Sequence, residues 1–117
     1  TFIFDAFIPA LQRLQQSVPL QTDFEGEYAP GQMLRRKAAS TPDYLNQLIE
    51  VHFQLEWEEE GGRMKQKDWH FPLRFFFRYE LEHLLDRSPF SSYTLYGDYE
   101  EHPLSGKSTD FVVICRA

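Results

Sequence analysis

The 117-residue sequence has little of what marks the most easily recognised protein classes. It contains one cysteine, Cys115, which excludes an internal disulfide and fits a reducing cytoplasm. It has no apolar run of about 18 residues, so no membrane-spanning helix is expected. The net charge is −6 and the one basic cluster, Arg35–Lys37, is short, which argues against a nucleic-acid partner. We therefore expect a cytoplasmic protein with neither a nucleic-acid nor a membrane partner.

Motifs that carry chemistry are missing too. The six glycines form neither G-x-G-x-x-G nor a Walker loop, and there is no G-x-S-x-G elbow. The four histidines are dispersed, which with one cysteine makes a zinc site unexpected. Cys115 lies in an apolar run, as an inert core thiol does. We predict no metal and assign no catalytic residue.

Alternation is the clearest local pattern in the chain. Apolar and polar side chains alternate from Ile49 to Glu58, which predicts a half-buried antiparallel strand. Gly61-Gly62 follows as a two-residue hairpin loop. That loop sets a register in which opposite charges face each other three times, as Glu60–Arg63, Glu58–Lys65 and Glu56–Lys67.

The sequence predicts an apolar strand at each end of the chain. Thr1–Phe7 and Asp110–Arg116 have almost no polar side, which predicts strands buried on both faces and neighbours in one sheet. A third strand is expected at Phe90–Tyr96. A helix from Phe77 has the stripe Phe77, Leu81, Leu84 and Leu85, and Pro89 closes it.

The remaining segments give weaker signals. Pro9–Ser17 has apolar residues at helical spacing, which predicts a short helix. Residues 19–31, with their prolines and glycines, are interpreted as irregular, Gln32–Ala39 as a short strand and residues 40–44 as a turn. The predicted fold class is α+β, with an antiparallel or mixed sheet and two helices. It forms a single domain or a fragment, divided into residues 1–19 (strand and helix), 20–74 (antiparallel insert) and 75–117 (helix and two strands).

Three stretches in order resemble class I S-adenosylmethionine-dependent methyltransferases. "TFIFDAFIPALQRL" resembles the family's fifth strand and following helix, and "LRFFFRYELEHLLDRSPFSSYTLYGDY" resembles its next helix and strand. "TDFVVICRA" looks like its final strand, and residues 20–68 resemble the antiparallel insert of some small-molecule members. Pro89 departs from the pattern, because the family usually has a glycine there with positive φ.

The resemblance implies the C-terminal half of a Rossmann-like fold with a β insert. The cofactor would be S-adenosyl-L-methionine, and the partner a small-molecule methyl acceptor. The family's glycine-rich loop and ribose-binding acid would precede residue 1, and the chain opens in mid-strand, so we expect a fragment of an enzyme that is inactive alone. The resemblance puts Asp5 and Pro9 at the floor of the acceptor pocket, and the substrate-binding residues are Phe7, Ile8, Trp69, Arg74, Phe76, Arg78 and Tyr79.

Several of these residues have a plainer interpretation. An arginine at 74 or 78 would bind an acidic group of the acceptor or pair with Glu80 or Glu82, and the spacing of Arg78 and Glu82 favours a helical ion pair. Trp57 and Trp69 fit packing within the insert. Two other functions remain open: a stand-alone ligand-binding module, and a dimerisation module that self-associates along an open Thr1–Phe7 edge.

Overall fold

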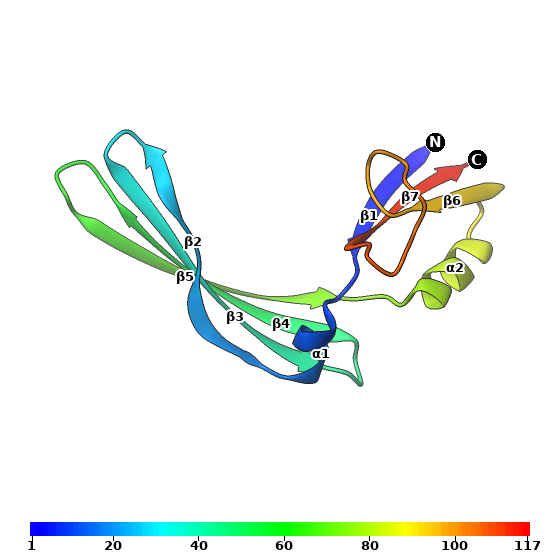
Figure 1. The fold of residues 1–117 in the computed structure, drawn as a ribbon, viewed down its shortest axis with the longest axis horizontal. Coiled ribbons are helices and arrows are strands. Elements are labelled where there is room, and N and C mark those ends of the chain that lie inside the picture. The colour runs from blue at the N-terminus through cyan, green and yellow to red at the C-terminus, as the bar shows by residue number, and fades with distance from the viewer. The chain divides into compact units, whose positions relative to one another are not determined.

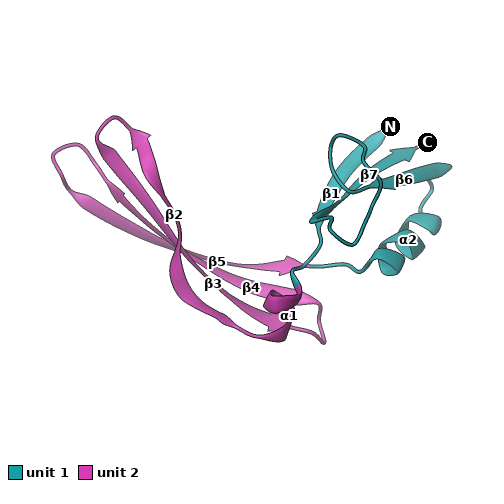
Figure 2. Ribbon diagram, viewed as in Figure 1, with its two compact units in different colours: residues 1–10, 75–117 teal, residues 11–74 magenta.

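The computed structural model describes residues 1–117 as seven strands and two helices (Figure 1). They divide into two compact units, coloured in Figure 2: unit 1 comprises residues 1–10 and 75–117, and unit 2 residues 11–74. The predicted α+β class with antiparallel strands and two helices is confirmed. The elements are β1 (Phe2–Phe7), α1 (Leu11–Gln15), β2 (Val18–Ala29), β3 (Gln32–Asp43), β4 (Leu48–Glu58), β5 (Met64–Arg74), α2 (Arg78–Asp86), β6 (Ser92–Tyr96) and β7 (Asp110–Arg116).

The sheet of unit 1 has three strands, with β7 between β1 and β6. β7 is antiparallel to both neighbours, and its Cys115 lies opposite Phe2 on one side and Tyr93 on the other. It follows that β1 and β6 run parallel to each other, with α2 in the chain segment that leads into β6. The prediction that the apolar strands from the two chain ends are neighbours is confirmed.

The core of unit 1 forms where α2 packs on β7. Phe111, Val113 and Cys115 are buried, and Leu81 and Leu85 of α2 pack on them. Leu84 was predicted to face the sheet, but it is 52% exposed. Leu81 and Leu85, at i and i+4 on one face of α2, are its buried residues.

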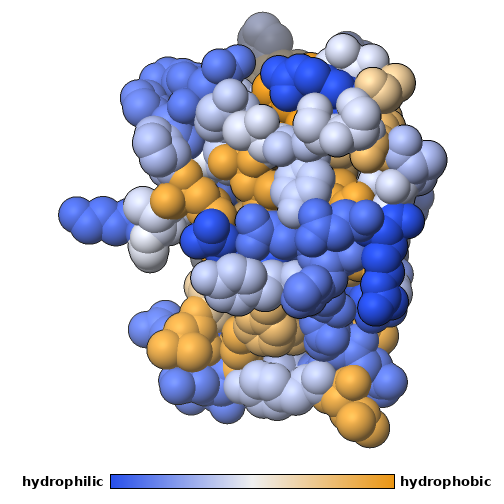
Figure 3. Space-filling view, turned by 90° about the vertical axis from the view of Figure 1, so that its right-hand side faces the viewer, coloured by the Kyte–Doolittle hydropathy of each residue, from blue (hydrophilic) through white to orange (hydrophobic).

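β1 is an edge strand, and the prediction that both of its faces are buried is wrong at its start. Phe4 and Ala6 pack against the core, whereas Phe2 and Ile3 are 52% and 55% exposed. Phe2 stacks on Phe90 with ring centroids 6.0 Å apart. Apolar side chains reach the surface as orange patches between polar ones on the face shown in Figure 3.

Unit 2 is a four-stranded antiparallel sheet in the order β2-β3-β4-β5. The alternation that predicted β4 is confirmed, but residues 19–31 are not irregular, since β2 spans Val18–Ala29. β2 lies at the sheet edge, and its pairing with β3 shifts register at three places, the first between Val18 and Gln21. Edge position and bulges are what allow a strand to include Pro19.

The β3–β4 turn lies further along the chain than predicted. Residues 40–43 extend β3, and the turn covers residues 44–47. The Asp43 carboxylate fixes that turn by accepting hydrogen bonds from the backbone N–H and side-chain amide of Asn46, at 3.1 and 2.9 Å. These bonds lower the pKa of Asp43.

The β4–β5 hairpin has a register one residue away from the predicted one. Glu58 lies opposite Met64 and Glu56 opposite Gln66, so the three expected charge pairs do not form. The loop has three residues, closed by a 2.8 Å hydrogen bond from Glu59 N–H to the Arg63 carbonyl, and both glycines have positive φ. In the observed register the apolar pairs Val51–Phe71 and Phe53–Trp69 share a face, so apolar pairing outweighs the charge pairs.

α1 is shorter than the predicted helix. It covers five residues and packs against β3, with Leu14 buried. Neither helix is long and apolar enough to cross a lipid bilayer.

Candidate functional site

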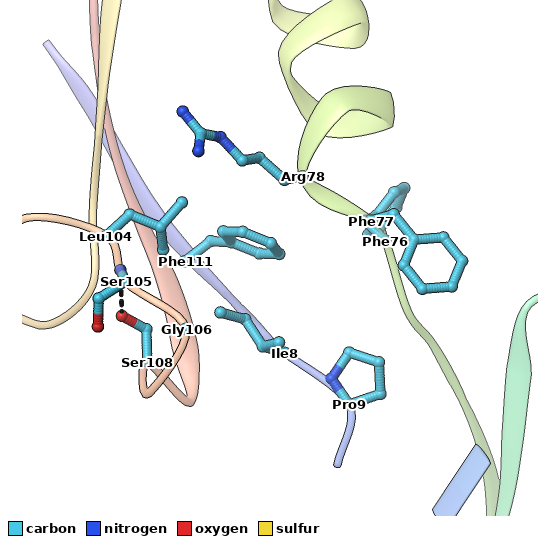
Figure 4. A pocket seen from close by; sticks show the side chains of 10 residues that line it. All are labelled: Ile8, Pro9, Phe76, Phe77, Arg78, Leu104, Ser105, Gly106, Ser108 and Phe111. Carbon is cyan, nitrogen blue, oxygen red and sulfur yellow. Dashed lines mark hydrogen bonds between the residues drawn. The ribbon is translucent and has the colours of Figure 1, made fainter. Parts of the chain in front are cut away.

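A cavity of about 530 Å³ opens in unit 1. Figure 4 shows its lining side chains, which come from three places: the end of β1, the start of α2, and the loop between β6 and β7 together with β7 itself. The lining residues are Ile8, Pro9, Phe76, Phe77, Arg78, Leu104, Ser105, Gly106, Ser108 and Phe111.

Local backbone geometry brings the first two groups to the cavity. Ile8 continues the pairing of β1, because its N–H donates to the Thr109 carbonyl at 2.8 Å, and Pro9 then ends the ladder. Phe77 is extended, and its carbonyl accepts the N–H of Leu81 at 3.0 Å as the first bond of α2. Arg78 is therefore the first residue of the helix.

The loop from Gly97 to Thr109 is held by its own polar groups. One Asp98 carboxylate oxygen accepts the N–H groups of Glu100 and His102 at 2.9 and 3.1 Å, and the other lies 2.7 Å from His102 Nδ1. The hydrogen bond with His102 lowers the pKa of Asp98. These bonds give the loop a defined conformation, including the part of it that lines the cavity.

One contact within the loop and one to β1 hold it in place. Ser108 Oγ accepts the N–H of Ser105 at 3.0 Å, and a Cβ at Gly97 would lie 2.4 Å from the same oxygen, so a larger residue there would displace the Ser108 hydroxyl. The Tyr99 hydroxyl donates to Asp5 Oδ2 of β1 at 2.6 Å. The Asp5 carboxylate raises the pKa of Tyr99, because it stabilises the protonated phenol.

Arg78 is the single charged side chain among the lining residues. Its Nε lies 3.5 Å from Glu82 Oε2, so the predicted helical ion pair is confirmed. Its guanidinium also lies over the Tyr79 ring, 5.3 Å from the centroid. The side chain is half-exposed, and Figure 4 shows it extending from the start of α2 toward the side where Leu104 and Phe111 lie.

The structure brings three of the seven expected substrate-binding residues to this cavity: Ile8, Phe76 and Arg78. Phe7 ends β1 opposite Asp110 and is not part of the lining, and Tyr79 is largely exposed. Trp69 and Arg74 belong to β5 of unit 2. The Trp69 ring lies 5.0 Å from that of Phe71 and is 57% exposed.

Sequence reasoning missed the loop residues from Leu104 to Ser108. Their sequence, LSGKS, is typical of turns, and no pattern in it predicts that the loop lies at the end of β1. Phe77 and Phe111 were expected as helix and strand positions without a part in the cavity.

A smaller cavity of about 190 Å³ lies in unit 2. Its Arg36 makes a two-pronged hydrogen bond to Asp23, at 3.0 and 2.9 Å, and covers the Phe53 ring at 4.6 Å. The bond to Asp23 raises the pKa of Arg36. Arg36 is therefore held more closely by its carboxylate than Arg78 is by Glu82, whose contact is 3.5 Å long.

The chemical inventory of the 530 Å³ cavity is that of a binding pocket. Six of its ten lining side chains are apolar, and the polar ones are one arginine and two serines. No histidine or carboxylate lines it beside the serines, so it contains no nucleophile with a base. It can enclose the apolar part of a ligand and present the Arg78 cation to that ligand.

No protein-family model and no curated protein matches the sequence. Among solved structures, the CcbJ methyltransferase from Streptomyces caelestis is similar, with a TM-score of 0.65 and 24% sequence identity. The likeness covers 99% of this chain and 45% of that one, so this chain spans less than half the length of that protein. At this identity the likeness concerns the fold, and residues 1–117 have a methyltransferase-like fold.

Proposed function

We propose that residues 1–117 form the C-terminal, substrate-side part of a cytoplasmic S-adenosylmethionine-dependent methyltransferase that acts on a small molecule. The observation that carries the proposal is the likeness to CcbJ, which uses 99% of this chain and 45% of that methyltransferase. Such a likeness is what one part of a larger enzyme would produce. The buried free thiol of Cys115 is compatible with the cytoplasm.

The strand arrangement of unit 1 supports a Rossmann-like origin. β1 and β6 are parallel and α2 precedes β6, as in the crossovers of doubly wound α/β folds. In such folds, ligands bind beyond the carboxyl ends of the parallel strands. Ile8 and Pro9 follow β1 directly and the loop containing Leu104 follows β6, so the cavity lies at those ends.

The cavity does not fit S-adenosylmethionine itself. It has no acidic side chain to bind a ribose or an ammonium group, and its one charge has the same sign as the sulfonium. We therefore assign it to the methyl acceptor and place the donor site outside these residues.

The contribution of this chain to catalysis would then be positioning and water exclusion. Ile8, Leu104 and Phe111, with the start of α2 beside them, would enclose the acceptor, and the anchored β6–β7 loop would cover it. Holding reactants in line and away from water supplies much of the rate of a displacement reaction. Neither contribution needs a catalytic acid or base from residues 1–117.

Calorimetric titration of S-adenosylmethionine into the complete gene product and into the 117-residue chain tests the proposal. We expect binding by the complete product and none by residues 1–117. Binding by the short chain alone would overturn the assignment. No binding by the complete product, with small-ligand binding retained, would favour a stand-alone ligand-binding module.

The exposed edge of β1 supports a second candidate function, a dimerisation module. β1 pairs only with β7, and Phe2 and Ile3 are exposed on it. Open apolar edges recruit further strands, and a lysine there blocks such pairing. In sedimentation velocity, we expect the chain to self-associate and Ile3→Lys to shift it to monomer. Equal sedimentation of the two proteins as monomers would exclude this function.

A further inference from the structure

We infer that the 530 Å³ cavity selects ligands that combine an apolar body with one carboxylate, and that Arg78 binds the carboxylate. The inference rests on the proposed function in taking the cavity as the acceptor site, and it adds the chemical class of the acceptor. Recognition of the ligand is argued from the cavity alone.

Charge is the first reason. The protein has 18 acidic side chains and a net charge of −6, yet none of the ten lining residues is acidic and one is a cation. A cation at the wall of an apolar cavity attracts an anionic ligand more than its neutral analogue, and solvent screens part of this attraction because the Arg78 side chain is half-exposed.

The geometry of Arg78 is the second reason. Its contact with Glu82 runs through Nε at 3.5 Å, which is long for a charge-assisted hydrogen bond. The planar guanidinium of Arg78 offers a fork of N–H donors that suits the two oxygens of a carboxylate. The contrast is Arg36 in unit 2, whose fork Asp23 already occupies.

The walls define the rest of the ligand. Phe111, Ile8 and Leu104, with the start of α2 at Phe76 and Phe77 beside them, give an apolar surface that a hydrated inorganic anion would not fill. The volume of about 530 Å³ lies within the usual range for small-molecule sites. An aromatic or aliphatic acid satisfies both the walls and the cation.

The test is an NMR titration of the 117-residue chain with 3-phenylpropanoate and, as the neutral match, 3-phenylpropanamide. Methyl signals of Ile8 and Leu104 report on the cavity. We expect the carboxylate to bind about tenfold more tightly than the amide, with the preference reduced at high salt. Equal affinities, or no shift of these methyl signals with either probe, would overturn the inference.

Three variants assign the preference to Arg78. Arg78→Gln should bring the two affinities to within about twofold of each other while amide binding remains. Glu82→Gln should tighten carboxylate binding a few-fold, because it removes the competing anion, whereas a purely structural ion pair would give no gain. Arg87→Gln, at the other end of α2 and outside the lining, is the matched control and should change neither affinity. A preference that survives Arg78→Gln would refute the role of Arg78.

The two proposals fail in different ways. If the carboxylate preference is lost but the complete gene product still binds S-adenosylmethionine, only the proposed class of acceptor is refuted. A retained preference with no S-adenosylmethionine binding removes the methyltransferase assignment and leaves a carboxylate-binding module.

Discussion

The two units use apolar side chains in different ways. In unit 1 the middle strand β7 is almost completely buried, and Leu81 and Leu85 of α2 pack on it. In unit 2 the sheet has four long strands, yet Trp69 and Phe24 remain 57% and 50% exposed. Unit 1 has the nine-residue α2 against its central strand, whereas unit 2 has only the five-residue α1.

This difference indicates where stability resides in each unit. Burial of β7 gives unit 1 a compact apolar core. Unit 2 has a small buried group that includes Leu14, Ile49 and Val51, and beyond it depends on backbone pairing and cross-strand contacts. The pocket with a cation is built on the unit with the larger core, as expected of a site that needs fixed walls.

Truncation of the α2 core should give the largest effect. Leu85→Ala removes a side chain that is 6% exposed and should lower the free energy of unfolding by about 2–5 kcal/mol. Leu84→Ala, one residue earlier and 52% exposed, is the matched control and should cost less than about 1 kcal/mol. Because Trp57 and Trp69 both lie in unit 2, urea denaturation should be followed through methyl NMR signals of β7.

Equal losses for Leu84→Ala and Leu85→Ala would contradict the observed packing. That result would mean that the helix presents the wider stripe expected from its periodicity.

A buried position of unit 2 should come next. Ile49→Ala removes a side chain that is 2% exposed and should cost about 2–4 kcal/mol, measured by tryptophan fluorescence in urea. Phe24→Ala, at a ring that is half-exposed and lies over Gly26, should cost less than about 1 kcal/mol. A Phe24→Ala loss as large as that of Ile49→Ala would show that the ring face is buried in solution, for example by self-association.

The Tyr93 hydroxyl should make the stability of unit 1 depend on pH in the alkaline range. Its hydroxyl donates to Asp86 Oδ1 at 2.8 Å, which raises the pKa of Tyr93 to about 12. Since the folded pKa exceeds the ordinary value of 10.0, this bond stabilises unit 1 fully below pH 10 and is lost as the pH rises toward about 12. Phenolate absorbance should show a late-titrating tyrosine that Tyr93→Phe removes and Asp86→Asn shifts to lower pH. Persistence of that step in Tyr93→Phe would assign it to another residue.

The sequence predicted best those elements whose pattern is local. Alternation from Ile49 to Glu58 gave β4, and the apolar run at Asp110–Arg116 gave β7 with the same bounds. The apolar character of both chain ends also predicted that β1 and β7 pair. In each case one physical term, burial of a face or of both faces, dominates the choice of structure.

Features that depend on contacts between distant segments could not be predicted from local sequence patterns. Leu84 and Leu85 have the same side chain, and only the way α2 packs on β7 distinguishes their burial. Pro19 indicated a loop, but β2 tolerates it at a bulged edge. For the site, Ile8, Phe76 and Arg78 were expected, whereas Leu104 and its loop depend on the Asp98 and Tyr99 contacts that only the fold shows.

The smallest effect concerns the charges around the β4–β5 hairpin. Glu56 Oε1 lies 3.3 Å from Lys37 Nζ of β3, whereas Lys67 lies opposite Leu55, on the other face of the sheet. A double-mutant cycle with Glu56→Gln and Lys37→Gln should give a coupling of about 0.2–1 kcal/mol, since both side chains are partly exposed to solvent, which screens the pair.

The same cycle with Lys67→Gln in place of Lys37→Gln should give a coupling near zero. Arg35, 3.8 Å from Glu56, is unchanged in both cycles, so its contribution cancels in the comparison. A larger coupling for Lys67 than for Lys37 would mean that the hairpin adopts the charge-paired register in solution. Phe53 would then face His70 instead of Trp69, and the Phe53–Trp69 ring contact of unit 2 would no longer exist.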